Sequence, residues 1–125
     1  MLVDTDVLIW HLRGNPRATR RLDEFGVLTL SVVSYLEVLQ GVRSRAEMLA
    51  VKKMLDKRSA SLLPLTEVIT TRATRLMESL TLSHGLQMGD ALIAATAVEH
   101  RLAVLTANVK HFSAVAGLVV EAFAP

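Results

Sequence analysis

Cysteine is missing from the 125 residues of this chain. Its absence excludes disulfide-stabilised folds, thiol catalysis and cysteine-ligated zinc, so any metal ion must be held by oxygen or imidazole ligands. The four histidines do not have the spacing of a zinc motif either; they are His11, His84, His100 and His111.

Long hydrophobic stretches are missing as well. Although 51% of the residues are hydrophobic, the longest apolar stretches, such as residues 114–120, are far shorter than the roughly 18 residues of a membrane-spanning helix. The chain starts Met-Leu-Val-Asp without a basic leader, so we expect no signal peptide, no membrane association and a cytoplasmic location. The composition is too apolar for a disordered chain, and the length suits a single domain over residues 1–125.

Short apolar segments alternate with helical patterns along the chain. We predict five short strands, at residues 1–5, 27–30, 61–65, 102–106 and 118–121. Ser31, Ser44 and Thr66 can cap helices between them, and a helix over 90–101 is apolar around most of its circumference. This alternation predicts an α/β fold of three layers, α/β/α, with a short parallel sheet of about five strands.

Asp4 and Asp6 come directly after the first predicted strand. Ligands of an open parallel sheet bind beyond the carboxyl ends of its strands, so acids there are candidates for a site. A carboxylate at the buried end of a strand must be paired, hydrogen-bonded or metal-bound, but Asp at a strand-to-helix junction is also a common helix cap. For Asp-Thr-Asp alone, the cap is the favoured interpretation.

Glu37 lies opposite the predicted apolar face of its helix, where a solvated glutamate is ordinary. That face consists of Val32, Tyr35, Leu36, Leu39 and Val42. The residues one helical turn away from Glu37 are small or uncharged, which suits the floor of a cleft better than a free surface. They are Val33, Ser34, Gln40 and Gly41.

Asp90 follows Gly89 at the predicted start of the apolar helix. Free N–H groups and the positive end of the helix dipole stabilise a carboxylate there, and capping alone would explain one such residue. The combination of Asp4, Glu37 and Asp90 is more informative, because all three could converge beyond the carboxyl edge of the sheet. Hard oxygen ligands of this kind suit Mg²⁺ or Mn²⁺.

One acid-based alternative is a haloacid-dehalogenase-like phosphatase, in which the first Asp of Asp4-Thr5-Asp6 is the nucleophile and the second an acid/base. That motif has Thr or Val where this chain has Leu8. It also has a second Asp where Ala94 follows Gly89-Asp90. The match is weak, and the phosphatase stays a distant alternative.

Three stretches follow one another across nearly the whole chain: LVDTDVLIW at residues 2–10, SVVSYLEVLQG at 31–41 and GDALIAATAVEHRLAVLTANVKHF at 89–112. In this order and spacing they resemble the PIN-domain ribonucleases, and most closely the VapC-type toxins of bacterial toxin-antitoxin pairs. The resemblance implies a PIN-like fold whose acidic pocket binds Mg²⁺ or Mn²⁺. It also implies hydrolysis of phosphodiester bonds in single-stranded or loop RNA, such as tRNA or rRNA, leaving a 3′-hydroxyl and a 5′-phosphate.

The resemblance also assigns residues and partners. It implies catalytic and metal-binding roles for Asp4, Glu37 and Asp90, supporting roles for Thr5, Asp6, Thr106 and Asn108, and RNA contacts for Arg13, Arg17 and Lys110. For each of the three basic residues alone, an ordinary solvated charge is the simpler interpretation. The implied partners are a DNA-binding, VapB-like antitoxin and a second copy of the chain, which together form a heterotetramer or a larger assembly.

Two residues depart from the family pattern. Asp6 stands where the family usually has Asn, and Asn108 stands where many members have a fourth acid. Three carboxylates give three negative charges against the four positive charges of two divalent ions, so we expect one tightly held ion. Asn108 also keeps open an alternative function, a degenerate PIN domain that binds RNA or protein without cleavage.

The net charge of +2 would be unevenly distributed if these acids form one pocket. If Asp4, Asp6, Glu37 and Asp90 share one pocket, eight of the 12 acidic side chains remain elsewhere against 14 basic ones, a balance of +6. A basic body around an acidic cleft suits a protein that attracts a polyanion and cuts it.

Overall fold

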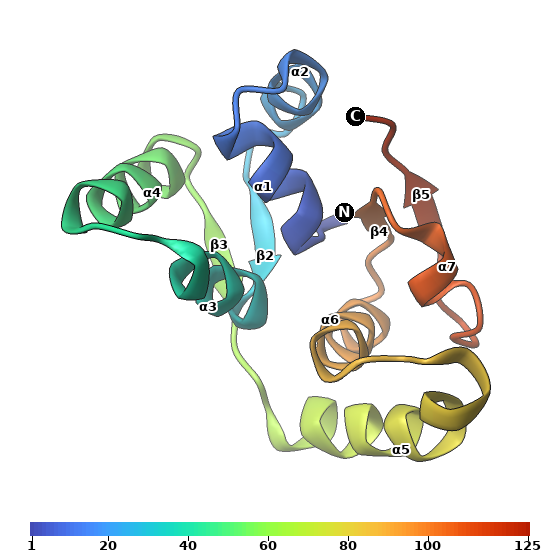
Figure 1. Cartoon of the computed structure of the whole chain (residues 1–125). Coiled ribbons are helices and arrows are strands. Elements are labelled where there is room, and N and C mark those ends of the chain that lie inside the picture. The colour runs from blue at the N-terminus through green and yellow to red at the C-terminus, as the bar shows by residue number, and fades with distance from the viewer.

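Five short parallel strands form the centre of the computed structural model, which describes residues 1–125. Three of them pair in the order β1-β4-β5, with bounds Leu2–Val3, Val104–Thr106 and Val120–Ala122. The other two, β2 (Thr29–Ser31) and β3 (Ser61–Leu63), pair with each other, and β2 runs next to β1. The predicted five parallel strands are confirmed, although they form two separately hydrogen-bonded sheets, one of three strands and one of two (Figure 1).

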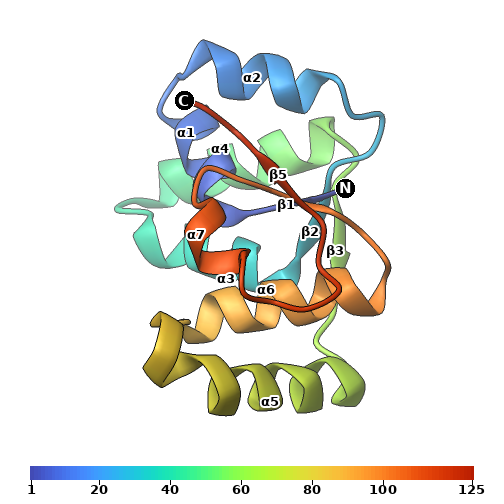
Figure 2. The same ribbon diagram turned by 90° about the vertical axis from the view of Figure 1, so that its right-hand side faces the viewer.

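Seven helices surround the strands. Their bounds are α1 Thr5–Leu12, α2 Pro16–Asp23, α3 Val32–Gly41, α4 Arg45–Lys57, α5 Glu67–His84, α6 Met88–Glu99 and α7 Val109–Phe112. Figures 1 and 2 show α1, α2 and α4 on one side of the strands and α6, with α5 outside it, on the other. This arrangement confirms the predicted three layers. None of the helices is both long and apolar enough to cross a membrane.

The predicted N-caps of three helices are confirmed. The side chains of Ser31, Ser44 and Thr66 each accept a hydrogen bond from a backbone N–H in the first turn of α3, α4 and α5. At the other end of α5, Gly85 has a φ of +64°, the left-handed conformation that ends many helices.

Several predicted boundaries are wrong by a few residues. The first strand ends at Val3, two residues early, because Asp4 already caps α1. The third ends at Leu63, because Pro64 has no N–H to extend the ladder. Helix α6 begins at Met88 with Gln87 as its N-cap and ends at Glu99, so Asp90 lies inside the first turn and does not cap the helix.

The predicted burial of the apolar helix is confirmed. Four alanines of α6 are fully buried, and this helix packs between α5 and the strands; they are Ala91, Ala94, Ala95 and Ala97. Small side chains allow close approach of the neighbouring elements on several sides. Helix α6 is therefore a fixed support for the residues of its first turn.

Strand register decides which residues meet at the carboxyl edge. Val3 of β1 pairs with Leu105 of β4 in a parallel ladder, so Asp4 and Thr106, the next residues along, lie side by side. Helix α3 starts directly after β2, which places its residues near the same edge. The fold thus brings residues from distant parts of the sequence to the start of α1.

Candidate functional site

Asp4 uses both carboxylate oxygens in hydrogen bonds. Its Oδ1 accepts from the backbone N–H of Thr5 at 2.8 Å, which confirms the predicted helix cap. Its Oδ2 accepts from the Thr106 hydroxyl at 2.8 Å, across the β1–β4 pair. Only 5% of the residue is exposed. A helix cap does not require such burial, so capping alone does not account for Asp4.

The pKa of Asp4 rises to about 7. Burial is the largest cause, the charge of Asp6 is the next, and Asp90 adds a smaller contribution. The hydrogen bonds from Thr106 and Thr5 lower the pKa but do not offset the burial. Asp4 therefore has a carboxylate whose charge is poorly compensated by the protein, which is the condition under which a cation binds well.

Asp6 lies one residue beyond Thr5 on α1 and shares the hydroxyl of Thr106. Its Oδ2 accepts from the Ala107 backbone N–H at 3.0 Å and lies 3.3 Å from the Thr106 Oγ1. Its Oδ1 is buried and has no hydrogen-bond partner. Burial is also the main reason why the pKa of Asp6 is raised.

Glu37 is tied to α1 through Thr5. The Thr5 Oγ1 lies 2.7 Å from Glu37 Oε1 and 3.0 Å from Ser34 Oγ. A hydroxyl has one proton, so the Thr5 hydroxyl donates to the carboxylate and accepts from Ser34. These contacts place the carboxylate of α3 beside the start of α1, although Glu37 as a whole residue is exposed.

The predicted apolar face of α3 is wrong. Leu36 is 54% exposed, and the buried residues of the helix are Val33, Ser34 and Val38. The face that packs on the protein therefore includes a fully buried serine one turn before Glu37. Helix α3 packs against α1 and α6, and the hydrophobic pattern alone does not show which of its faces does so.

Asp90 faces His111. Its Oδ2 lies 3.1 Å from the His111 Nδ1. Burial raises the pKa of Asp90, and the charges of Glu37 and Asp6 raise it further, while His111 lowers it. The pKa of Asp90 thus responds to Glu37 and Asp6, and the pKa of Asp4 responds to Asp6 and Asp90. The four carboxylates therefore share one electrostatic environment.

Gly89 provides a direct measure of how closely α3 approaches α6. A Cβ atom at Gly89 would lie 2.9 Å from Glu37 Oε2, closer than an ordinary contact. The Glu37 carboxylate therefore packs against the backbone of the first turn of α6, next to Asp90.

The donor set fits a hard divalent cation. Four carboxylates gather at one edge, the pKa values of Asp4 and Asp90 are raised partly by neighbouring carboxylates of this group, and Asp6 has an unpartnered oxygen. No three acidic or histidine side chains already surround one point as ligands. Glu37 is hydrogen-bonded to Thr5 and Asp90 to His111, so side chains must turn before three of them can share an ion.

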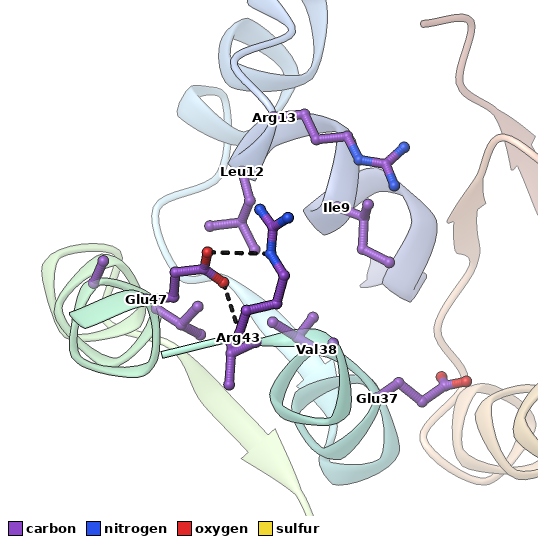
Figure 3. A pocket seen from close by; sticks show the side chains of 11 residues that line it. Ile9, Leu12, Arg13, Glu37, Val38, Arg43 and Glu47 are labelled. Carbon is purple, nitrogen blue, oxygen red and sulfur yellow. Dashed lines mark hydrogen bonds and ion pairs between the residues drawn. The ribbon is translucent and has the colours of Figure 1, made fainter. Parts of the chain in front are cut away.

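The remaining predicted residues lie farther from the carboxylates or contact them differently. Asn108 is exposed, and its backbone N–H, not its side chain, donates to the Thr106 hydroxyl at 2.9 Å. Arg17 and Lys110 are exposed and form no ion pair. Arg13 lines a cavity of about 640 Å³ between α1, α3 and α4, and Glu37 lies at its edge with its side chain directed toward α6 (Figure 3).

The sequence patterns do not predict the contacts that three residues make in this region: Ser34 with Thr5, Gly89 with Glu37, and His111 with Asp90. Ser34 had a local signal, because it lies one turn before Glu37 on the same helix face. The contact between His111 and Asp90 has none, since it depends on how α7 packs against α6.

Comparison with known proteins gives consistent results. Residues 1–118 match the PIN domain family. Ribonuclease VapC10 of Mycobacterium tuberculosis is 44% identical over 118 residues, which cover 90% of this chain and 85% of that protein. Among solved structures, a toxin-antitoxin complex from Klebsiella pneumoniae is similar with a TM-score of 0.78 at 27% identity over 94% of both chains. VapBC2 from Rickettsia felis, bound to a promoter DNA fragment, has a TM-score of 0.83 at 16% identity over 98% of both chains and shows the shared fold.

Proposed function

This chain belongs to the PIN domain family, and from that premise we propose that it is a Mg²⁺- or Mn²⁺-dependent endoribonuclease, the toxin of a toxin-antitoxin pair. The observation that supports the metal-dependent activity most directly is the meeting of Asp4, Glu37 and Asp90 from three different elements. The charges of Asp6 and Asp90 add to the raised pKa of Asp4, and the charges of Glu37 and Asp6 add to the raised pKa of Asp90. The phosphatase alternative receives no support from the family match.

Asp4, Glu37 and Asp90 would hold the ion, and the free Oδ1 of Asp6 adds an acceptor beside them. When bound, the ion supplies a water of lowered pKa and stabilises the negative charge that develops on the phosphate oxygens. One ion is the better match, because the three carboxylates assigned as its ligands give three negative charges against the four positive charges of two ions.

The chain's own residues orient these acids. The Thr106 hydroxyl and the Thr5 N–H fix the Asp4 carboxylate, and the Thr5 hydroxyl fixes Glu37. Thr5 therefore bonds to two of the three acids, one through its backbone and one through its side chain. His111 partly neutralises Asp90 until the ion binds.

The substrate in this proposal is single-stranded or loop RNA, such as tRNA or rRNA, and the whole chain, residues 1–125, acts as one domain. Arg13, beside the cavity that Glu37 borders, and the exposed Arg17 and Lys110 are the candidate contacts to RNA phosphates. The partners are a DNA-binding, VapB-like antitoxin and a second copy of the chain, in a heterotetramer or larger assembly. A cytoplasmic location, where such RNA is present, belongs to the same proposal.

The test is RNA cleavage by purified protein free of antitoxin. Total RNA is incubated with Mg²⁺, with Mn²⁺ and with EDTA, and the cut ends are mapped for a 5′-phosphate. We expect metal-dependent cleavage that Asp4→Asn abolishes. Asp56→Asn, which removes an exposed carboxylate of α4, should cut as the unsubstituted protein does.

Absence of cleavage with either ion would contradict the proposal. Thermal unfolding with increasing Mn²⁺ then separates the alternatives. A ribonuclease site gains stability from Mn²⁺ and loses that gain on Asp4→Asn, whereas a degenerate domain that only binds RNA or protein shows no gain in either form.

A further inference from the structure

A second cavity lies between α1, α2 and α4, away from the acids. Its volume is about 570 Å³, and its charged lining comes from Asp23, Lys53, Lys57 and Arg58, with His11 beside them. No part of the candidate metal site lines it. Three basic side chains against one acidic side chain give this cavity a positive charge.

Arg58 is built into the wall of this cavity. Its side chain is only 18% exposed, and its Nη1 lies 2.9 Å from Asp23 Oδ1. A guanidinium has five N–H donors, and Arg58 makes no other side-chain hydrogen bond or ion pair. Donors of a fixed, largely buried guanidinium therefore remain free for a ligand that accepts hydrogen bonds.

His11 also lines this cavity and has one ring nitrogen without a partner. Its Nδ1 lies 2.7 Å from Thr19 Oγ1, and the Thr19 hydroxyl itself donates to the carbonyl of Asn15 at 3.2 Å. Because that hydroxyl has one proton, the His11 Nδ1–H donates to Thr19. The Nε2 of His11 has no partner in the protein and can acquire a proton.

The surroundings of His11 favour its neutral form when no ligand is present. Burial lowers its pKa, the positive charge of Arg58 lowers it further, and Asp23 opposes both. Lys53 and Lys57, on adjacent turns of α4, line the same cavity. An anion in the cavity would reverse this balance, since it would favour the protonated imidazole.

The two lysines are available to such an anion. Lys53 and Lys57 are exposed and have no carboxylate within ion-pair distance. Helix α4 has one other lysine, Lys52, but it lines a different cavity, next to Tyr35 and Asp56. Only one edge of α4 therefore contributes to the basic cavity.

The basic cavity lies next to the one that Glu37 borders. Ala50 of α4 lines both, with Glu47 and Val51 on the side toward Glu37 and Lys53 and Lys57 on the other. Both cavities therefore lie along α4, and Glu37 borders one of them. Acids repel the phosphates of an RNA strand, so the attraction that holds it must come from cations nearby.

We propose that this basic cavity is a subsite that binds a backbone phosphate of the RNA strand, on the same molecule as the acids that cut it. The proposal rests on the proposed ribonuclease function. A phosphate oxygen accepts from Arg58 and from protonated His11, and the two lysines neutralise its charge. Carboxylates of an acidic protein segment would accept the same hydrogen bonds. We favour phosphate because the proposed substrate carries one at every nucleotide and the cavity shares Ala50 with the one that Glu37 borders.

The test measures RNA binding without cleavage. A fluorescent single-stranded RNA is titrated with protein in EDTA, and its anisotropy is followed at several salt concentrations. The double variant Lys53→Ala with Lys57→Ala should bind about tenfold more weakly, with a salt dependence lower by about 0.7 in log–log slope for each lost phosphate contact. Lys52→Ala, from the same helix and of the same type, should bind within about twofold of the unsubstituted protein.

A second readout uses His11 itself. NMR titration of its ring proton against pH should give a higher pKa with the RNA bound than without it, and the double lysine variant should reduce this rise. These lysines are exposed, so the variant should retain its fold, which the same spectra verify.

Three results would overturn the subsite. The double variant could bind RNA as Lys52→Ala does, the His11 pKa could be unchanged by RNA, or the double variant could lose affinity only for the antitoxin, which would assign the cavity to a protein partner. Failure of the ribonuclease proposal is distinguishable, because it would abolish metal-dependent cleavage while the binding differences in EDTA remain.

Discussion

Substitution of Gly89 by alanine tests whether the position of Glu37 matters for activity. An added Cβ would lie 2.9 Å from Glu37 Oε2, and ordinary contacts begin near 3.4 Å, so the carboxylate must move by about 0.5 Å. The Glu37 carboxylate is the end of a flexible side chain, so it can yield without moving the backbone. Its hydrogen bond with the Thr5 hydroxyl, now 2.7 Å, would lengthen or break.

The stability effect of Gly89→Ala should be small because two contributions oppose each other. Alanine favours a helix over glycine by up to about 1 kcal/mol, and less in the first turn. Weakening a hydrogen bond to a charged group costs about 1.5 to 3 kcal/mol when the bond is lost entirely. We expect the free energy of unfolding to change by about 1 kcal/mol or less.

The activity effect should be larger. Misplacement of a catalytic group by about 1 Å can cost about a hundredfold in rate, so half that displacement corresponds to about tenfold. Single-turnover RNA cleavage and urea unfolding would measure the two effects side by side. Gly26→Ala is the control, since a Cβ there meets nothing within 4 Å.

Two results would refute this reasoning. Cleavage by Gly89→Ala at the rate of the unsubstituted protein would mean that Glu37 is not required where the structure has it. A loss of several kcal/mol in stability would mean that the Glu37 side chain cannot move aside, so the contact is structural.

Two further predictions concern the same acids. Because the pKa of Asp4 is raised from 3.8 to about 7 in the folded protein, its contribution to stability is complete below pH 3.8 and is lost as the pH rises through 7. The free energy of unfolding of the metal-free protein should therefore fall by up to about 4 kcal/mol between these limits. Thermal unfolding in EDTA at several pH values should show this decline, and Asp4→Asn should flatten it. A flat profile for the unsubstituted protein would contradict the prediction. Thr5→Val removes the hydroxyl between Ser34 and Glu37 and should cost about 1 to 3 kcal/mol in urea unfolding together with most of the cleavage rate, while Thr5→Ser should restore both. Equal activity of the valine and serine variants would show that the hydroxyl does not orient Glu37.

Much of the fold follows from local sequence patterns. Caps at Ser31, Ser44 and Thr66, together with periodic apolar residues, place the helices, because these signals act within one or two turns. Local apolar patterns likewise predict strand β4 and the burial of helix α6. The predicted strand ends are wrong where a helix cap or a proline stops a strand that the apolar residues alone would continue, as at Asp4 and Pro64.

The acids of the candidate site are predictable as a set, but their contacts are not. Asp4, Glu37 and Asp90 are identified from their motifs and from the family resemblance, and the parallel alternation of strands and helices predicts that they meet. The hydrophobic pattern assigns the wrong buried face to α3, so the orientation of Glu37 comes from packing against α1 and α6.

The sequence by itself therefore determines the order of elements, the family and the identity of the acids, because those properties reside in local periodicity and in short motifs. Only the tertiary structure decides that His111 faces Asp90, that Gly89 leaves room for Glu37, and that α4 directs Lys53 and Lys57 to the wall that contains Arg58. These contacts join residues that are far apart along the chain or on different helices. Their geometry depends on how whole elements pack, which no single segment specifies.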